Sequence, residues 1–133
     1  MLKIKSSGTA LPAQDIKRAR QFYEQKLGLK PGQEQPGGGV MYATGETGFL
    51  VFPSSGKASG DHTQMALEVE DVAIAARELK NAGVRLEEYD LPNFKSHDGV
   101  VDMPDGEKGA WFKDTEGNLI ALASRVPAVT RSS

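Results

Sequence analysis

Three side chains are the candidates for acid–base chemistry in this sequence: one glutamate and the two histidines. Glu68 and Gln64 belong to one alternating segment, and the two histidines are His62 and His97. A carboxylate in apolar surroundings, or an imidazole, can transfer a proton near neutral pH. The chain contains no cysteine, which excludes disulfides, thiolate metal sites and a cysteine nucleophile. The candidate catalytic residues are therefore Glu68, His62 and His97.

Each histidine also fits a simpler interpretation. His62 follows Asp61 at the end of a segment rich in glycine and serine, and His97 precedes Asp98 in an expected loop over residues 92–99. Both patterns are typical of solvated loop residues. The side chains of the neighbouring His97 and Asp98 diverge, so the pair does not form a catalytic dyad by itself.

The elements that must position these residues come from an internal repeat. Asp15 precedes a helical pattern that Gly28 ends, and Asp71 precedes a second pattern that Gly83 ends. The two aspartates are 56 positions apart and the two glycines 55. Each aspartate is a plausible helix N-cap, although Arg18 stands where a capping box would have a glutamate. The repeat predicts two copies of one unit that share a core and face each other across a cleft.

We expect helices over residues 16–27 and 72–82, from apolar side chains at three- and four-residue spacing. The expected strands are 6–13, 40–44, 49–52, 64–70, 85–91, 109–113 and 119–123, and residues 31–39 are expected as a loop or a poor edge strand. The fold class is therefore α+β, with tandem βαβββ halves over about 6–53 and 62–124. These halves are expected to form a curved mixed β-sheet cup with both helices on its convex side. Residues 1–124 would be a single domain and 125–133 a flexible tail.

Strand alternation predicts which side chains line the cup. With Gln64 and Glu68 facing the cup, Met65 and Leu67 pack under the helices. One residue of each pair Trp111/Phe112 and Met41/Tyr42 must also face the cup, and Trp111 and Tyr42 are the candidates for contact with a ligand.

A cup of this composition suits an organic molecule held by apolar contacts and a few hydrogen bonds. The alternative is that side chains or a partner subunit fill the cup.

Composition excludes several classes of partner. The net charge is −2 and the isoelectric point about 5.7, whereas a nucleic-acid-binding protein needs a basic face. The N-terminal residues contain no long apolar run typical of a secretory signal, and no segment is long enough to span a membrane. We therefore expect a cytoplasmic protein that binds neither nucleic acid nor membrane.

Two segments resemble the vicinal oxygen chelate superfamily, which includes glyoxalase I, bleomycin-resistance proteins and extradiol dioxygenases. Residues 15–23 (DIKRARQFY), followed by residues 27–29 (LGL), are similar to the opening of that family. Residues 110–122 (AWFKDTEGNLIAL) resemble its terminal hairpin, with Thr115 and Glu116 in place of the usual proline and aspartate. The resemblance covers residues 8–124 and implies the cup-shaped fold and a homodimer.

The resemblance also implies where a metal would be bound. Metal-dependent members carry one ligand on the first and last strand of each half, and these positions fall on Gly8, Val51, Gln64 and Ala121. A catalytic divalent metal needs about three protein ligands with nitrogen or oxygen donors. Only Gln64 offers such an atom, so we expect no metal and no cofactor. Because the ligand positions of the family face the cup, the resemblance also implies that Val51 and Ala121 line it, together with Phe49, which has the same strand parity as Val51.

Four hypotheses about the function follow. The first is a binding protein for a small organic molecule that resembles bleomycin-resistance proteins, although a net charge of −2 suits a strongly cationic drug poorly. The second is a metal-independent lyase or isomerase that uses Glu68 or a histidine. A metal-dependent glyoxalase or dioxygenase would follow if the ligand positions lay elsewhere, and a purely structural domain would follow if the cup were filled.

Overall fold

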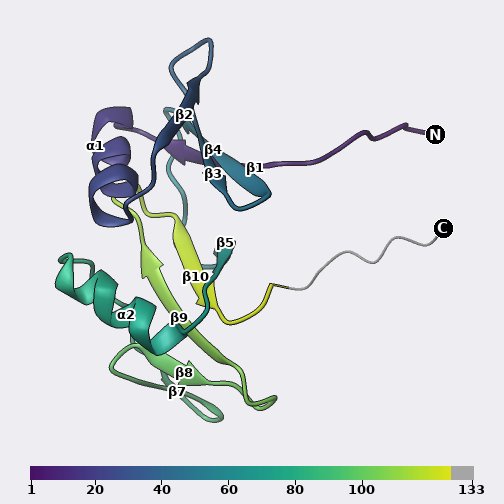
Figure 1. Cartoon of the computed structure of the whole chain (residues 1–133). Coiled ribbons are helices and arrows are strands. Elements are labelled where there is room, and N and C mark those ends of the chain that lie inside the picture. The colour runs from purple at the N-terminus through teal and green to yellow at the C-terminus, as the bar shows by residue number, and fades with distance from the viewer. Residues whose placement is uncertain (127–133) are drawn as a thin grey trace. The chain divides into compact units, whose positions relative to one another are not determined.

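The strands of the computed structural model form two mixed sheets, which confirms the α+β class (Figure 1). The structure describes residues 1–126, so most of the predicted tail lies outside the described residues. The chain divides into two compact units. The first comprises Met1–His62 with the loop Asp114–Asn118, and the second comprises Thr63–Lys113 with the chain from Leu119 onward.

The first unit is a four-stranded sheet with one helix. Its elements are β1 (Thr9–Ala13), α1 (Ile16–Gln21), the π-helical turn η1 (Phe22–Lys26), β2 (Pro31–Glu34), β3 (Val40–Thr44) and β4 (Thr47–Pro53). The strand order is β1-β4-β3-β2, with β1 parallel to β4 and the other pairs antiparallel. The predicted helix over 16–27 is therefore α1 prolonged by η1. Residues 31–39 were expected to be a loop or a poor edge strand, and they include the short edge strand β2.

The second unit is a six-stranded sheet with one helix. Its elements are β5 (Thr63–Glu68), α2 (Val72–Asn81), β6 (Asp90–Leu91), β7 (Phe94–His97), β8 (Val100–Asp102), β9 (Lys108–Lys113) and β10 (Leu119–Ala123). The order is β5-β10-β9-β8-β7-β6, with only β5 and β10 parallel. Figure 1 shows α2 packed across β9 and β10.

The segment between α2 and β8 differs from the prediction. A strand over residues 85–91 and a loop over 92–99 were expected. Within the expected strand, only Leu86, which bridges to Phe112, and residues 90–91 take part in β-pairing, whereas β7 occupies half of the expected loop. The chain reverses at the turn before Phe94, where Asn93 has a φ of 64°, and Phe94 then pairs with Leu91. This turn forms a hairpin that strand periodicity did not indicate.

The first helix begins with a cap that is completed from far away in the sequence. The Asp15 side chain accepts a hydrogen bond from the backbone N–H of Arg18, as an N-cap does. In a capping box, the residue at the position of Arg18 is a glutamate that accepts the N–H of the cap residue. Here Glu116 accepts that N–H at 3.0 Å and also binds the Arg18 guanidinium at 2.8 Å. Glu116 therefore supplies the missing half of the capping box and holds its loop against α1.

Each sheet packs one face against its own helix. In the first unit, the ring of Tyr23 lies 5.6 Å from that of Tyr42 and 5.4 Å from that of Phe49, and all three side chains are buried. In the second unit, the buried side chains of Ala110, Phe112, Ile120 and Leu122 share the face that packs against α2. The face of each sheet that points away from its helix is called the open face below.

Candidate functional site

Three aromatic side chains gather on the open face of the second sheet. Trp111 lies between Ala110 and Phe112 in β9, and because those two neighbours face α2, Trp111 points to the open face. Its indole ring is 5.6 Å from the ring of Tyr89 and 5.4 Å from that of Phe94, with tilted or edge-on geometry. The Tyr89 and Phe94 rings are themselves 5.2 Å apart. These three residues, called the aromatic cluster, remain partly exposed.

Small residues and one hydrogen bond hold the indole of Trp111 in place. A Cβ on Gly109 would lie 2.9 Å from the Trp111 ring, so glycine is needed for the ring to lie over β9. On the other side, Trp111 faces Ala121 of β10, which in turn faces Ala66 of β5. The indole N–H donates to the Thr63 hydroxyl at 3.0 Å. The ring is thus fixed beside a shallow apolar surface, an arrangement that suits a flat organic molecule.

Gln64 adds a polar point to the same sheet. It lies where the register between β5 and β10 shifts by one residue, because Thr63 pairs with Leu119 but Met65 pairs with Ile120. Its Oε1 atom is buried and has no hydrogen-bond partner within the described residues. A buried acceptor without a donor is unfavourable by about 1–3 kcal/mol. A ligand that carries an N–H or O–H group could satisfy it.

The predicted catalytic residues are not gathered in one place. Glu68 is exposed at the end of β5, and its carboxylate accepts the backbone N–H of Val126 at 2.7 Å. His97 lies on β7, separated from β5 by β10, β9 and β8. Because neighbouring strands are about 4.8 Å apart, the strands that carry these two residues are separated by about 19 Å across the sheet. His62 is exposed at the end of the first unit. Glu68 and His97 therefore cannot act as an acid–base pair within one chain.

The first sheet shows that the predicted orientation of β4 was wrong. Phe49 and Val51 were expected to face the cup, but both are buried on the face that packs against α1 and η1. For β3 the sequence left Met41 and Tyr42 as alternatives, and the structure buries Tyr42, the candidate for contact with a ligand, on that same face. The Tyr42 hydroxyl donates to Glu24 at 2.8 Å, and burial together with this carboxylate raises the pKa of Tyr42.

The physical reason is that both faces of β4 are apolar. Leu50 and Phe52, which were expected under the helix, alternate with the buried set and therefore lie on the open face. Ala121 and Trp111 lie on the open face of their sheet. The sequence left open which of Trp111 and Phe112 lies there, and the structure turns Phe112 to the opposite face.

Two members of the aromatic cluster were missed from the sequence. Tyr89 was assigned to a regular strand and Phe94 to a loop, and neither was connected with Trp111. The available signal was the turn around Asn93 between apolar residues, which is a hairpin pattern that brings Phe94 back beside the strand before it.

Neither a metal-binding cluster nor a membrane-spanning helix is found among the described residues. Among residues 1–126, no group of three or more His, Cys, Asp and Glu side chains is arranged to hold a metal ion. Within the same range, no helix is both long and apolar enough to cross a membrane.

Comparisons with known proteins identify the family and the fold. The family model described as "Glyoxalase/Bleomycin resistance protein/Dioxygenase superfamily" matches residues 7–122. No curated protein sequence matches the chain significantly.

Among solved structures, a lactoylglutathione lyase from Agrobacterium tumefaciens is 19% identical, with a TM-score of 0.67 over 90% of this chain and 93% of its own. A bleomycin-binding protein complexed with bleomycin is 20% identical, with a TM-score of 0.68 over 92% and 100%. A bleomycin resistance determinant encoded on the transposon Tn5 is 21% identical, with a TM-score of 0.67 over 90% and 97%. At these identities the likeness concerns the fold.

Proposed function

Because this chain belongs to the Glyoxalase/Bleomycin resistance protein/Dioxygenase superfamily, we propose that it is a binding protein for a small, flat organic molecule and needs no catalytic metal. The ligand would lie against the aromatic cluster of Tyr89, Phe94 and Trp111. The observation that carries this proposal is the fixed, partly exposed indole of Trp111 on the open face of the second sheet.

The chemistry of this surface supports an aromatic ligand. An aromatic ring gains about 0.5–1.5 kcal/mol from a well-placed aromatic neighbour beyond the effect of burial. The alanines at positions 66 and 121 leave space on the strands beside Trp111. The unpaired Oε1 of Gln64 would accept a hydrogen bond from a ligand N–H or O–H. The ligand class is therefore a flat apolar molecule with at least one donor.

The residues at the metal positions support a function without catalytic metal. Gly8, Val51 and Ala121 offer no donor atom, and Gln64 offers one neutral amide oxygen. Val51 also faces the helix of its unit, and the neighbours that replace it on the open face, Leu50 and Phe52, are hydrocarbon side chains. Whichever face of β4 is turned to the site, its side chains offer no metal ligand.

The proposal can be tested by following the fluorescence of Trp111, the one tryptophan in the chain. We would titrate the protein with anilinonaphthalene sulfonate, an aromatic probe, and in parallel with bleomycin. We expect saturable quenching of Trp111 by the probe and weak or no response to bleomycin, because a chain with a net charge of −2 attracts a cationic drug poorly.

A pair of variants separates the aromatic cluster from general apolar binding. Phe94→Ala keeps the tryptophan but removes one ring, and we expect it to weaken probe binding by about tenfold, which corresponds to 1.4 kcal/mol. Ile74→Ala, which removes an exposed apolar side chain on α2, should leave the affinity unchanged. Equal affinity in Phe94→Ala and the parent protein would refute the proposed location.

The oligomeric state and compartment remain part of this proposal. The resemblance to the family favours a homodimer in the cytoplasm. Light scattering after size-exclusion chromatography should then give twice the chain mass of 14.3 kDa. A mass of one chain at all concentrations would contradict the dimer.

A further inference from the structure

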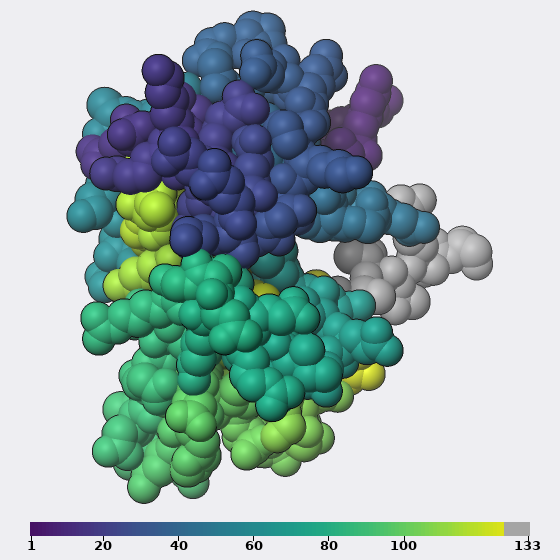
Figure 2. Space-filling model, turned by 60° about the vertical axis from the view of Figure 1, so that its left-hand side comes forward, coloured from purple at the N-terminus to yellow at the C-terminus, as the bar shows by residue number. Residues whose placement is uncertain are grey.

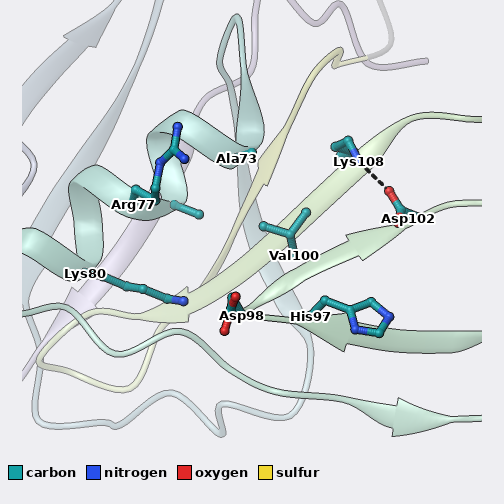
Figure 3. Close-up of a pocket in the computed structure, with 9 residues that line it drawn as sticks. Ala73, Arg77, Lys80, His97, Asp98, Val100, Asp102 and Lys108 are labelled. Carbon is teal, nitrogen blue, oxygen red and sulfur yellow. Dashed lines mark hydrogen bonds and ion pairs between the residues drawn. The ribbon is translucent and has the colours of Figure 1, made fainter.

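A pocket lies in the second unit, on the face of β7–β9 opposite to the aromatic cluster. It has a volume of about 320 Å³ and lies between α2 and the β7–β8 hairpin (Figure 3). Its apolar lining residues are Ala73, Ala76 and Val100, and its other lining residues carry charged or imidazole side chains. From its charges and shape, we propose that this pocket binds a phosphate group, either free or as a phosphate monoester.

Two unpaired cations line the helix side of the pocket. Arg77 and Lys80 are three residues apart on α2, so their side chains share one face of the helix. Both are exposed, and neither makes an ion pair or a hydrogen bond within the described part of the chain. The space-filling view shows α2, in teal to green, at the surface of its unit (Figure 2). Figure 3 shows the Lys80 side chain extended from α2 toward the β7–β8 hairpin.

The strand side of the pocket adds a third cation and an imidazole. Lys108 on β9 forms an ion pair with Asp102 on β8. The hydrogen bond and the charge of Lys108, together with the nearby His97, lower the pKa of Asp102. Asp102 is therefore already matched by a cation. The remaining carboxylate is that of Asp98, which lies opposite Lys80.

The balance of these charges favours an anion. Arg77, Lys80 and Lys108 supply three positive charges against the two carboxylates of the lining. An arginine fork and a lysine ammonium are the side chains that commonly bind phosphate oxygens. The imidazole of His97 on the same wall can donate a further hydrogen bond.

The wall that faces α2 is held in position by its turn. Asp98 and Gly99 form the two-residue turn between β7 and β8, with φ values of 53° and 83°. A Cβ on Gly99 would lie 2.4 Å from Leu86 Cδ1, so the turn packs tightly on Leu86. A wall that is already in place lowers the entropic cost of binding. The alanines opposite it keep the pocket open.

The test uses backbone amide spectra of the whole chain labelled with ¹⁵N. Inorganic phosphate and, separately, phenyl phosphate are titrated at constant ionic strength, with chloride as the reference anion. We expect saturable shifts confined to α2 and the β7–β8 hairpin for both probes. Tighter binding of phenyl phosphate would indicate that a monoester is the better ligand, and equal affinities would indicate that the phosphate group alone is recognised.

The controls are variants that lose one positive charge outside the pocket, as the pocket variants lose one within it. Arg77→Gln and Lys80→Gln should each weaken phosphate binding by about tenfold or more. Arg85→Gln and Lys17→Gln remove an exposed cation outside the pocket and should leave the affinity unchanged. Ala73→Leu fills part of the pocket without changing its charge and should also weaken phosphate binding.

Absence of saturable shifts, or equal weakening in the pocket and control variants, would overturn the proposal. Because the pocket and the aromatic cluster lie on opposite faces of the strands, Arg77→Gln should not change the affinity for anilinonaphthalene sulfonate. Failure of either site therefore leaves the test of the other intact.

Discussion

Replacement of Glu116 by glutamine should destabilise the protein in a way that depends on pH. The Glu116 side chain is almost completely buried and accepts hydrogen bonds from the Arg18 guanidinium, the Asp15 N–H and the Thr115 hydroxyl. Burial alone would raise its pKa, but these bonds lower it from the usual 4.5 to about 2. A glutamine keeps the size of the side chain but removes the charge.

The size of the effect follows from the two pKa values. The difference between 4.5 and about 2 corresponds to about 3.4 kcal/mol, at 1.36 kcal/mol per pH unit. Arg18 is half exposed, with 52% of its side-chain surface accessible, so solvent screens part of this interaction. We therefore expect a loss of about 2 kcal/mol in the free energy of unfolding at pH 7. Because the folded-state pKa is lowered, this stabilisation is complete above pH 4.5 and disappears as the pH falls toward 2.

Urea unfolding of the parent protein and Glu116→Gln at pH 7 and pH 3 measures this dependence. At pH 3 the difference between the two proteins should fall to about half of its value at pH 7. Glu46→Gln, which changes an exposed glutamate in the β3–β4 turn, serves as the control and should be neutral at both values. A difference between the parent and Glu116→Gln that is the same at both pH values would refute the assignment of Glu116 as a charged cap.

Two further substitutions test the packing around the two units. Tyr23→Phe removes the 2.6 Å hydrogen bond to Asp114 and should lower the free energy of unfolding by about 1–3 kcal/mol in the same urea assay, because the buried Asp114 Oδ2 atom loses one of its two donors and keeps only the Asn118 amide. A neutral result would show that the Asn118 amide alone satisfies this oxygen. Gly109→Ala should displace the indole of Trp111 and shift its fluorescence maximum, because the new Cβ would lie 2.9 Å from the ring. Gly8→Ala, whose Cβ meets no atom within 4 Å, should leave the spectrum unchanged, and equal spectra in both variants would contradict the ring position.

Within the second half of the fold, β5 and α2 could be predicted well because their residues carry a clear pattern. In residues 64–68, apolar and polar side chains alternate, and the structure places Met65 opposite Ile120 and Ala66 opposite Ala121. The Asp71 cap and the Gly83 stop bracket α2, and Gly83 has the positive φ expected of a helix stop. Such signals are local, so they can be recognised in a single sequence.

In the first half, the sequence carried less information about which face of each strand packs against the helix. Phe49 and Val51 alternate with Leu50 and Phe52, so hydrophobicity alone cannot distinguish the two faces of β4. The contact with Tyr23 decides the face, and that contact joins residues distant in the sequence.

Parts of the candidate sites could not be predicted because they depend on side-chain contacts between residues that are distant in the sequence. Thr115 and Glu116 were treated as a minor departure from the family pattern, yet Glu116 caps a helix 101 residues earlier. Arg77 and Lys80 have the appearance of an ordinary solvated helix face. This helix face lines a pocket only because the β7–β8 hairpin lies opposite it in the folded chain.

The measurement that tests the central claim most directly is a native mass spectrum of the protein equilibrated with equal amounts of zinc and anilinonaphthalene sulfonate. The account predicts that the chain retains the organic probe and no stoichiometric zinc, and that Phe94→Ala retains less probe than Ile74→Ala. Retention of one zinc ion per chain, or of no probe, would contradict a binding function based on the aromatic cluster of Tyr89, Phe94 and Trp111.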